Sequence, residues 1–382
     1  MRKLTILTLI FLVAFSKTNA QETQNTITTA APFLLIAPDA RAGGMGDIGV
    51  ATSPDAYSQH WNASKIAFMP SQYTLGIVYT PWLRALTNDV FLGGFSFANK
   101  IDDRSAWATS LKYFNLGQID LTDINGAPQG TEKLNEFSLD ASYSLKLSET
   151  YAMGVTMRYI RSDLGIKSAN STIKPVSTFA VDISGYFQSN EKNYGNFNGV
   201  WRAGYNISNI GPKVSYTDNG QDSNYIPTNL KIGTGFDFIL DNYNKVSLNL
   251  EFNKLLVPTP NISLNADGVS APYTQDNVSF VSGIFKSFGD APGGFSEELK
   301  EVTWALGAEY MYDNSFAIRA GYFNESDLKG ARKYFTLGSG FKFKSSRIDI
   351  SYLFNASNIN NPLENTLRFS LSFDFGKLFE IN

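Results

Sequence analysis

Apolar and polar residues alternate along this chain from about Tyr73 to the C-terminus, in stretches of roughly ten residues. In the stretch FSLDASYSLKL, residues 137–147, all the apolar side chains share one face and all the polar ones share the other. Successive residues of a strand point to opposite sides, so this pattern predicts a strand with one apolar and one polar face. Such strands, repeated through a chain, indicate an all-β transmembrane barrel in a bacterial outer membrane.

The alternating stretches number about fourteen, and single-chain bacterial barrels have an even number of strands. We therefore predict a fourteen-stranded antiparallel barrel from the stretches 73–80, 89–99, 106–114, 136–147, 151–161, 179–188, 199–208, 228–240, 245–253, 302–312, 316–323, 333–344, 348–355 and 365–375.

The connections between these stretches alternate in length, as in a barrel with short periplasmic turns and long external loops. The short connections are 148–150, 241–244, 313–315 and 345–347. The long connections are 115–135, 162–178, 209–227 and 254–301. The connection 189–198 is a modest exception. This order favours a membrane barrel over a water-soluble all-β protein.

The alternation also predicts which side chains face lipid. In the stretch 151–159 the outward residues are Tyr151, Met153, Val155, Met157 and Tyr159, with aromatic rings at both ends, as two membrane interfaces require. In the last stretch Leu367, Phe369, Leu371, Phe373 and Phe375 take that place. The charged residues of the opposite face are expected to pair across the lumen rather than to conduct ions or to catalyse a reaction: Asp140, Arg158, Asp182, Glu251, Glu309, Arg319, Arg368 and Asp374.

The first twenty residues have the pattern of a signal peptide. Arg2 and Lys3 precede an apolar run of about twelve residues, 4–15, and Ala20 precedes the expected cut. The run is shorter than the roughly 20 residues that a membrane-spanning helix needs. We therefore divide the chain into a signal peptide (1–20), an N-terminal hatch (21–72) and a barrel (73–382) with one long external loop (254–301).

Composition excludes several kinds of chemistry. The chain has no cysteine, so disulfides, thiolate metal sites and cysteine nucleophiles are excluded. His60 is the one histidine, which leaves little for a zinc site or a serine–histidine catalytic pair. The net charge of −3 becomes −6 when Arg2, Lys3 and Lys17 leave with the signal peptide, so nucleic acid is not an expected partner. We predict no cofactor, no metal and no catalytic residue.

Residues 21–72 lack the alternation of a strand and contain many small residues. A barrel of fourteen strands is too wide for its own side chains to fill, so we expect this segment to plug the lumen. The alternative is a disordered periplasmic tail, but Trp61, Ile66 and Phe68 supply more apolar bulk than such tails have. The predicted hatch residues are Pro38, Asp39, Arg41, Gly43, Gly44, Met45, Gly46, His60, Trp61 and Asn62.

Two stretches of the hatch carry a family resemblance. The run LIAPDARAGGMG at 35–46 and the run HWNA at 60–63 resemble the hatch of the FadL superfamily of fourteen-stranded barrels. Many members have Asn-Pro-Ala where this chain has Asn62-Ala63-Ser64, a minor departure. The blocks 287–295, 297–299, 307–310, 319–323 and 361–369 resemble more closely the PorV (LptO) family, outer-membrane barrels of the type IX secretion system.

This resemblance implies protein export. Barrels of the PorV family associate with the large translocon barrel of the system and bind the C-terminal signal domain of secreted cargo. They then deliver the cargo to a surface attachment complex that contains a sortase-like protease. Outer-membrane lipid, including lipopolysaccharide, is the remaining expected partner.

The loop 254–301 is the place where we expect partners to bind, because loops of this length are usually functional. Its aromatic residues Phe280, Phe285, Phe288 and Phe295 either dock on a partner or fold back over the barrel mouth. Asp290 is included in the predicted surface. Three glutamates, Glu297, Glu298 and Glu301, are expected to form a solvated rim, with orientation of a basic partner as the alternative.

Two other functions are compatible with a barrel. A FadL-like channel for hydrophobic small molecules would need an apolar path through the hatch. Strand glycines at 93, 94, 233, 235, 338 and 340 either bend the wall for such a channel or let the hatch approach it. A lipid hydrolase would need a serine activated by a base, but His60 lies in the hatch and the chain has no Gly-x-Ser-x-Gly motif.

Overall fold

The computed structural model describes residues 26–83, 87–123, 125–164, 167–168, 171–217, 223–260, 262–264, 270–272, 278–357 and 364–379. The predicted signal peptide lies outside these residues. Within them, no helix combines the length and the apolar character that crossing a membrane requires.

Fourteen long strands form one closed antiparallel sheet, which confirms the predicted fold class. They are β1 (Ser71–Pro81), β2 (Phe91–Lys100), β3 (Ser105–Thr122), β4 (Pro128–Lys146), β5 (Tyr151–Asp163), β8 (Val176–Gln188), β10 (Asn198–Ile210), β13 (Asn229–Ile239), β14 (Asn244–Leu255), β17 (Thr303–Tyr312), β18 (Phe316–Asn324), β19 (Lys333–Phe343), β20 (Ser346–Asn355) and β21 (Leu367–Leu378). Each pairs with the next along the chain, and β1 pairs with β21 to close the ring. All fourteen predicted stretches correspond to these strands.

The long connections contain more structure than the sequence predicts. The predicted loop 115–135 is wrong, because β3 and β4 stay paired as far as Thr122 and Pro128, with a register shift after Asn115. This part of the hairpin is exposed on both faces, so its sequence has no alternation to reveal a strand. The turn predicted at 345–347 lies earlier, since β19 ends at Phe343 and β20 begins at Ser346.

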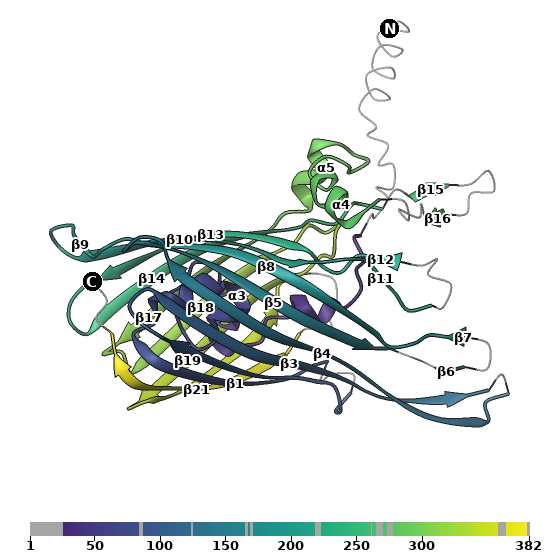
Figure 1. The fold of residues 1–382 in the computed structure, drawn as a ribbon, viewed down its shortest axis with the longest axis horizontal. Coiled ribbons are helices and arrows are strands. Elements are labelled where there is room, and N and C mark those ends of the chain that lie inside the picture. Colours follow the sequence, from purple (N-terminus) through teal and green to yellow (C-terminus); the bar gives the residue numbers. More distant parts are fainter. Residues whose placement is uncertain are drawn as a thin grey trace, which may run out of the picture.

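Short strands and helices occupy the other long connections. They are β6 (Lys167–Ser168), β7 (Ser171–Thr172), β11 (Val214–Ser215), β12 (Ser223–Asn224), β15 (Ile262–Leu264), β16 (Ser270–Pro272), α4 (Phe280–Lys286) and α5 (Phe295–Lys300). They gather at one end of the barrel, and the C-terminus lies near the other end (Figure 1). The strand β9 (Lys192–Asn193) pairs with the start of β10 in the connection that is the exception to the short turns.

The two faces of the sheet follow the predicted alternation. Along β5, Met153, Val155 and Met157 are exposed, whereas Arg158 is buried on the lumenal side. Arg158 lies between two carboxylates of the neighbouring strands, 2.8 Å from Asp140 and 3.0 Å from Asp182. The alternation therefore separates a lipid face from a lumenal face that is charged.

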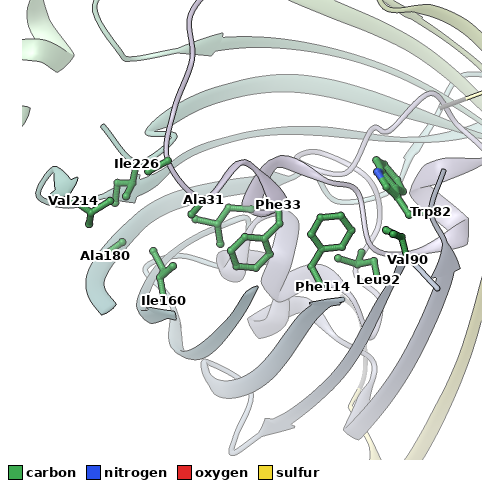
Figure 2. Packing of buried hydrophobic residues seen from close by; sticks show 12 residues of the cluster. Ala31, Phe33, Trp82, Val90, Leu92, Phe114, Ile160, Ala180, Val214 and Ile226 are labelled. Carbon is green, nitrogen blue, oxygen red and sulfur yellow. The ribbon is translucent and has the colours of Figure 1, made fainter. Parts of the chain in front are cut away.

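Residues 26–70, which we call the lumenal segment, run through the barrel from the long-loop end to the short-turn end. The segment contains η1 (Pro32–Leu35), α2 (Ala40–Gly43), α3 (Ser58–Trp61) and η2 (Ala63–Phe68). Near its start, Phe33 packs against Leu92, Phe114 and Ile160 at the long-loop ends of three strands (Figure 2). Near its end, Ile66 and Met69 pack against Ala98 and Ala106, where β2 and β3 meet at a short turn.

Replacement of Val155 by Arg tests which face meets lipid. Val155 is 52% exposed in the middle of β5. A cation at the bilayer midplane destabilises a barrel by about 2–4 kcal/mol, so we expect V155R to lower the free energy of unfolding by that amount. The measurement is denaturant unfolding in lipid vesicles. S148R, in a short turn, is the control and should change it by less than about 0.5 kcal/mol; equal loss in both variants would contradict the assignment.

Candidate functional site

The lumenal segment touches the barrel wall through glycines on both sides. A Cβ on Gly44 would lie 3.0 Å from the Cα of Gly338 in β19, and a Cβ on Gly46 would lie 3.0 Å from the carbonyl oxygen of Tyr322 in β18. Gly46 also has φ +78°, a conformation that favours glycine. Gly321 on the wall leaves no room for a Cβ because the backbone of Met45 occupies the space. The segment and the wall are therefore in backbone-to-backbone contact.

This contact accounts for three of the six strand glycines. Gly233 faces Val50, Gly235 faces the carbonyl oxygen of Ala51, and Gly338 faces Gly44, so these three let the lumenal segment approach the wall. Gly93 contacts only Phe91 of its own strand, and Gly94 and Gly340 contact neighbouring strands.

Arg41 joins α2 to the barrel wall. Its guanidinium forms ion pairs with Glu309 of β17 at 3.0 Å and with Asp55 of the lumenal segment at 2.8 Å. Glu309 also accepts from Arg319 of β18 at 2.6 Å, and Arg319 reaches Asp349 of β20 at 2.7 Å. The prediction that lumenal charges pair across the interior is thus incomplete, since they pair between adjacent strands and with the lumenal segment.

Two acidic residues make contacts that the sequence did not predict. Asp47 pairs with Arg368 of β21 and accepts from the Tyr334 hydroxyl at 2.6 Å. Glu251 of β14 accepts two backbone N–H groups of the lumenal segment, those of Gly49 and Val50, at 2.9 Å each. Glu251 is fully buried. In the sequence, the only indication of these contacts is the presence of a polar residue at a lumenal position.

The conformation of the lumenal segment is stabilised by hydrogen bonds of Asp39, Trp61 and Asn62. Asp39 caps α2 by accepting from the Ala42 N–H at 2.9 Å, and it accepts from the Trp61 indole at 2.7 Å. Burial and the nearby charge of Asp55 raise the pKa of Asp39 to about 6. Asn62 donates to the carbonyl oxygens of Val50 and of Gly185 on β8, at 2.9 and 3.0 Å.

The remaining predicted hatch residues also lie in the lumenal segment. Pro38 is buried, Gly43 is the last residue of α2, and Met45 is 1% exposed. The His60 ring packs edge-to-face on Trp61 at 5.1 Å. Burial and the cations Lys112, Lys231 and Arg158 lower the pKa of His60 well below its usual value. His60 is therefore neutral at pH 7.

No metal-binding group is found among the described residues, in which no three His, Cys, Asp or Glu side chains cluster. A lumenal cavity at the long-loop end has a volume of about 510 Å³. Its lining is mixed, because apolar residues such as Leu35, Leu255 and Phe323 lie there together with Lys231, Glu325 and Arg332.

Replacement of Gly321 by Ala tests the contact between the lumenal segment and the wall. Because a Cβ at this position meets the backbone of Met45, we expect G321A to displace the segment and to destabilise the protein by about 1–3 kcal/mol. The measurement is limited proteolysis of residues 26–70 together with thermal unfolding. G93A is the matched control, because its Cβ meets nothing nearer than 3.6 Å. Identical behaviour of the two variants would contradict the contact.

A second candidate site lies on the long loop between β14 and β17, where the structure describes residues 256–260, 262–264, 270–272 and 278–302. Its helices α4 and α5 lie outside the ring of strands at the long-loop end (Figure 1). Apolar side chains with large exposed fractions are Val281 (49%), Phe285 (74%), Phe288 (54%), Phe295 (77%) and Leu299 (57%). We call these five residues the loop surface. Phe280 is partly buried.

Buried ion pairs fix this loop to the barrel. Lys254 at the end of β14 binds Glu298 at 2.9 Å and Glu301 at 2.7 Å. Lys329, from the connection between β18 and β19, binds Glu297 at 2.6 Å and Glu301 at 3.0 Å. The prediction of a solvated rim of glutamates is therefore wrong, because Glu298 and Glu301 are buried partners of two lysines.

The fold of the loop leaves Asp290 partly buried. Burial raises the pKa of Asp290, and the charges of Glu298 and Glu301 add to the effect. The neighbouring Ala291 N–H donates to Glu298 at 2.8 Å. Asp290 thus lies beside the anchoring carboxylates, whereas Phe285, Phe288 and Phe295 are exposed.

Replacement of Lys254 by Met tests the anchor. Removal of one partner from a buried ion pair costs about 3–5 kcal/mol, so we expect the helices to detach locally in K254M. Chymotrypsin should then cleave after Phe285, Phe288 or Phe295 at least about tenfold faster, while the barrel stays folded. K286M, on the exposed side of α4, is the control. Unchanged cleavage in K254M would show that the ion pairs do not hold the loop.

Comparison with known proteins relates the chain to a secretion family. A family model described as type IX secretion system protein PorV matches residues 19–262. No curated protein matches the chain.

Solved structures share the barrel fold at low sequence identity. The toluene transporter TodX of P. putida has a TM-score of 0.51 and 11% identity, over 90% of this chain and 99% of that one. The CymD monoaromatic hydrocarbon channel has a TM-score of 0.51 and 12% identity, over 90% and 99%. A Pseudomonas aeruginosa FadL homologue has a TM-score of 0.46 and 11% identity, over 89% and 98%.

Proposed function

Because the chain belongs to the PorV family of type IX secretion system proteins, we propose that it carries secreted proteins from the translocon to the cell surface. The chain is an outer-membrane barrel of that system. In the proposed sequence of events, the protein first associates with the translocon barrel and binds the C-terminal signal domain of the cargo. It then passes the cargo to an attachment complex with a sortase-like protease, which would cleave the signal domain.

The loop surface is the observation that carries this proposal. Two of its exposed phenylalanines, Phe285 and Phe295, lie on the short helices α4 and α5, and Phe288 lies between these helices. Aromatic residues of this kind dominate the binding energy of protein interfaces. The buried pairs of Lys254 and Lys329 hold these helices on the rim, so little conformational entropy is lost on binding. We propose that this surface binds the translocon or the cargo signal domain.

The lumenal segment has the proposed role of a hatch that closes the barrel. The ion pairs of Arg41 and Asp47 with the wall and the contact of Met45 with Gly321 support this role. The same contacts argue against the alternative, a channel for hydrophobic molecules. Such a molecule would have to pass between the segment and the wall, where charged groups and backbone groups are in contact. We propose no catalytic role for His60, since no hydrogen bond joins it to a serine among the described residues.

Charged substitutions on the loop surface test the proposal. We expect the double variant F285D/F295D to lower the recovery of translocon and signal-domain-bearing cargo at least about tenfold, because each buried aromatic anchor contributes about 2 kcal/mol or more. The measurement is co-purification from native outer membranes through a tag in the turn 123–127 between β3 and β4, which is remote in sequence from the loop and its anchoring lysines.

The matched control is S282D/S296D, which adds the same charge to exposed polar positions of α4 and α5. The control should leave recovery unchanged. Wild-type recovery with F285D/F295D would exclude the loop surface as the binding site. A wild-type barrel that purifies alone, with bound fatty acid or hydrocarbon, would instead favour the channel.

A further inference from the structure

A second group of charges lies at the short-turn end, far from the loop surface. A cavity of about 740 Å³ opens there between the turns 101–104 and 147–150 and the end of β21. Short turns of bacterial barrels face the periplasm, so this cavity opens toward that side. Its lining has four cations and two carboxylates: Lys100, Arg104, Lys146, Lys377, Asp103 and Glu149.

The cations of this cavity lack acidic partners. None of the four forms an ion pair with a carboxylate among the described residues, whereas most lumenal cations do. Lys100 is 2% exposed, and its ammonium donates only to the carbonyl oxygen of Met69 at 3.1 Å. An ammonium group has three donors, so two of them have no hydrogen-bond acceptor among the described residues. A buried cation without a counter-charge is costly, which indicates that an anion belongs beside it.

Two aromatic rings hold the ammonium groups at the cavity. Lys100 and Lys377 lie over the ring of Phe379, at 4.5 and 5.1 Å from its centroid. Lys146 lies over the ring of Phe68 at 4.4 Å. Cation–π attraction orients the lysines without neutralising them. The cavity is thus preorganised for an anion and has a net charge of about +2 from its lining.

The border of the cavity is apolar where it meets the rim. Leu147 is 54% exposed and Leu378 is 74% exposed, and both line the cavity. Lysines beside exposed leucines at the end of the strands match a phosphate headgroup with an acyl chain. An acidic peptide would use the lysines but would leave the leucines without a partner.

We propose that this cavity binds a phosphate group, and that the group belongs to a phospholipid of the periplasmic leaflet. Lys100, Lys146 and Lys377 contact the phosphate, and Leu147 and Leu378 contact the start of the acyl chain. The site is independent of the loop surface, so it does not depend on the proposed export function.

Native mass spectrometry of the purified full chain tests this proposal. The probes are dioleoyl phosphatidic acid, dioleoyl glycerol (which has the same acyl chains and no phosphate) and inorganic phosphate. We expect phosphatidic acid to be retained and dioleoyl glycerol not to be. The double variant K146Q/K377Q should reduce retention at least about tenfold, since it removes two of the three positive charges that contact the phosphate. Circular dichroism and heat-modified gel mobility show whether each variant is folded.

K344Q is the matched control. Lys344 lies in a turn on the same rim and also over an aromatic ring, that of Phe343 at 5.3 Å, but does not line the cavity. It should leave retention unchanged. Equal retention in K146Q/K377Q, or equal retention of dioleoyl glycerol, would overturn the proposal. Inorganic phosphate that displaces the lipid at equal concentration would overturn the lipid source while keeping the phosphate chemistry.

One further outcome would also overturn the lipid source. An acidic periplasmic protein that co-purifies with wild type but not with K146Q/K377Q, without any change in lipid retention, would identify a peptide as the ligand.

Discussion

A fourteen-stranded barrel encloses a lumen that the side chains of its own strands cannot fill. In this protein the lumenal face also carries buried charges, and a buried charge is costly unless it is paired. The lumenal segment meets both needs. Arg41 neutralises Glu309, Asp47 neutralises Arg368, and the N–H groups of Gly49 and Val50 bind Glu251. The arrangement of the wall and of the segment therefore depends on these charge contacts.

The contacts also explain why the segment is rich in small residues. Gly44 and Gly46 let its backbone lie against the wall, and Gly321 and Gly338 make room from the other side. A side chain at any of these positions would keep the backbone away and would separate the ion pairs. Close approach and charge pairing thus support each other, and the closed lumen results from both.

The loop between β14 and β17 is likewise held by buried ion pairs, at the barrel rim. Its glutamates are buried against Lys254 and Lys329, and this attachment leaves the apolar side chains of α4 and α5 with no place in a core. Exposed aromatic groups on a fixed support are suited to binding a protein. The situation at the opposite rim differs. There Lys100 and Lys146 have no carboxylate partner among the described residues and are suited to binding an anion.

Alternation in the sequence was enough to predict the strands, their number and the face of each that meets lipid. Alternation is a local property, so residues such as Val155 and Arg158 reveal their sides without knowledge of any partner. It also pointed to the exposed phenylalanines, because apolar residues in a long loop need a partner surface. The sequence did not reveal the extension of β3 and β4 beyond the membrane, since neither face is buried there and no alternation arises.

The pairing of charges could not be predicted from the sequence, because it depends on the fold. Arg41 and Glu309 lie 268 positions apart, and no local pattern links them. The glutamates at 298 and 301 look like a solvated run in the sequence, yet the fold buries them against Lys254 from another strand. The gathering of Lys100, Lys146 and Lys377 around Phe68 and Phe379 likewise depends on closure of the barrel. Two charges pair when they are close in the folded protein. These distances are set only when the first and last strands meet and the barrel closes.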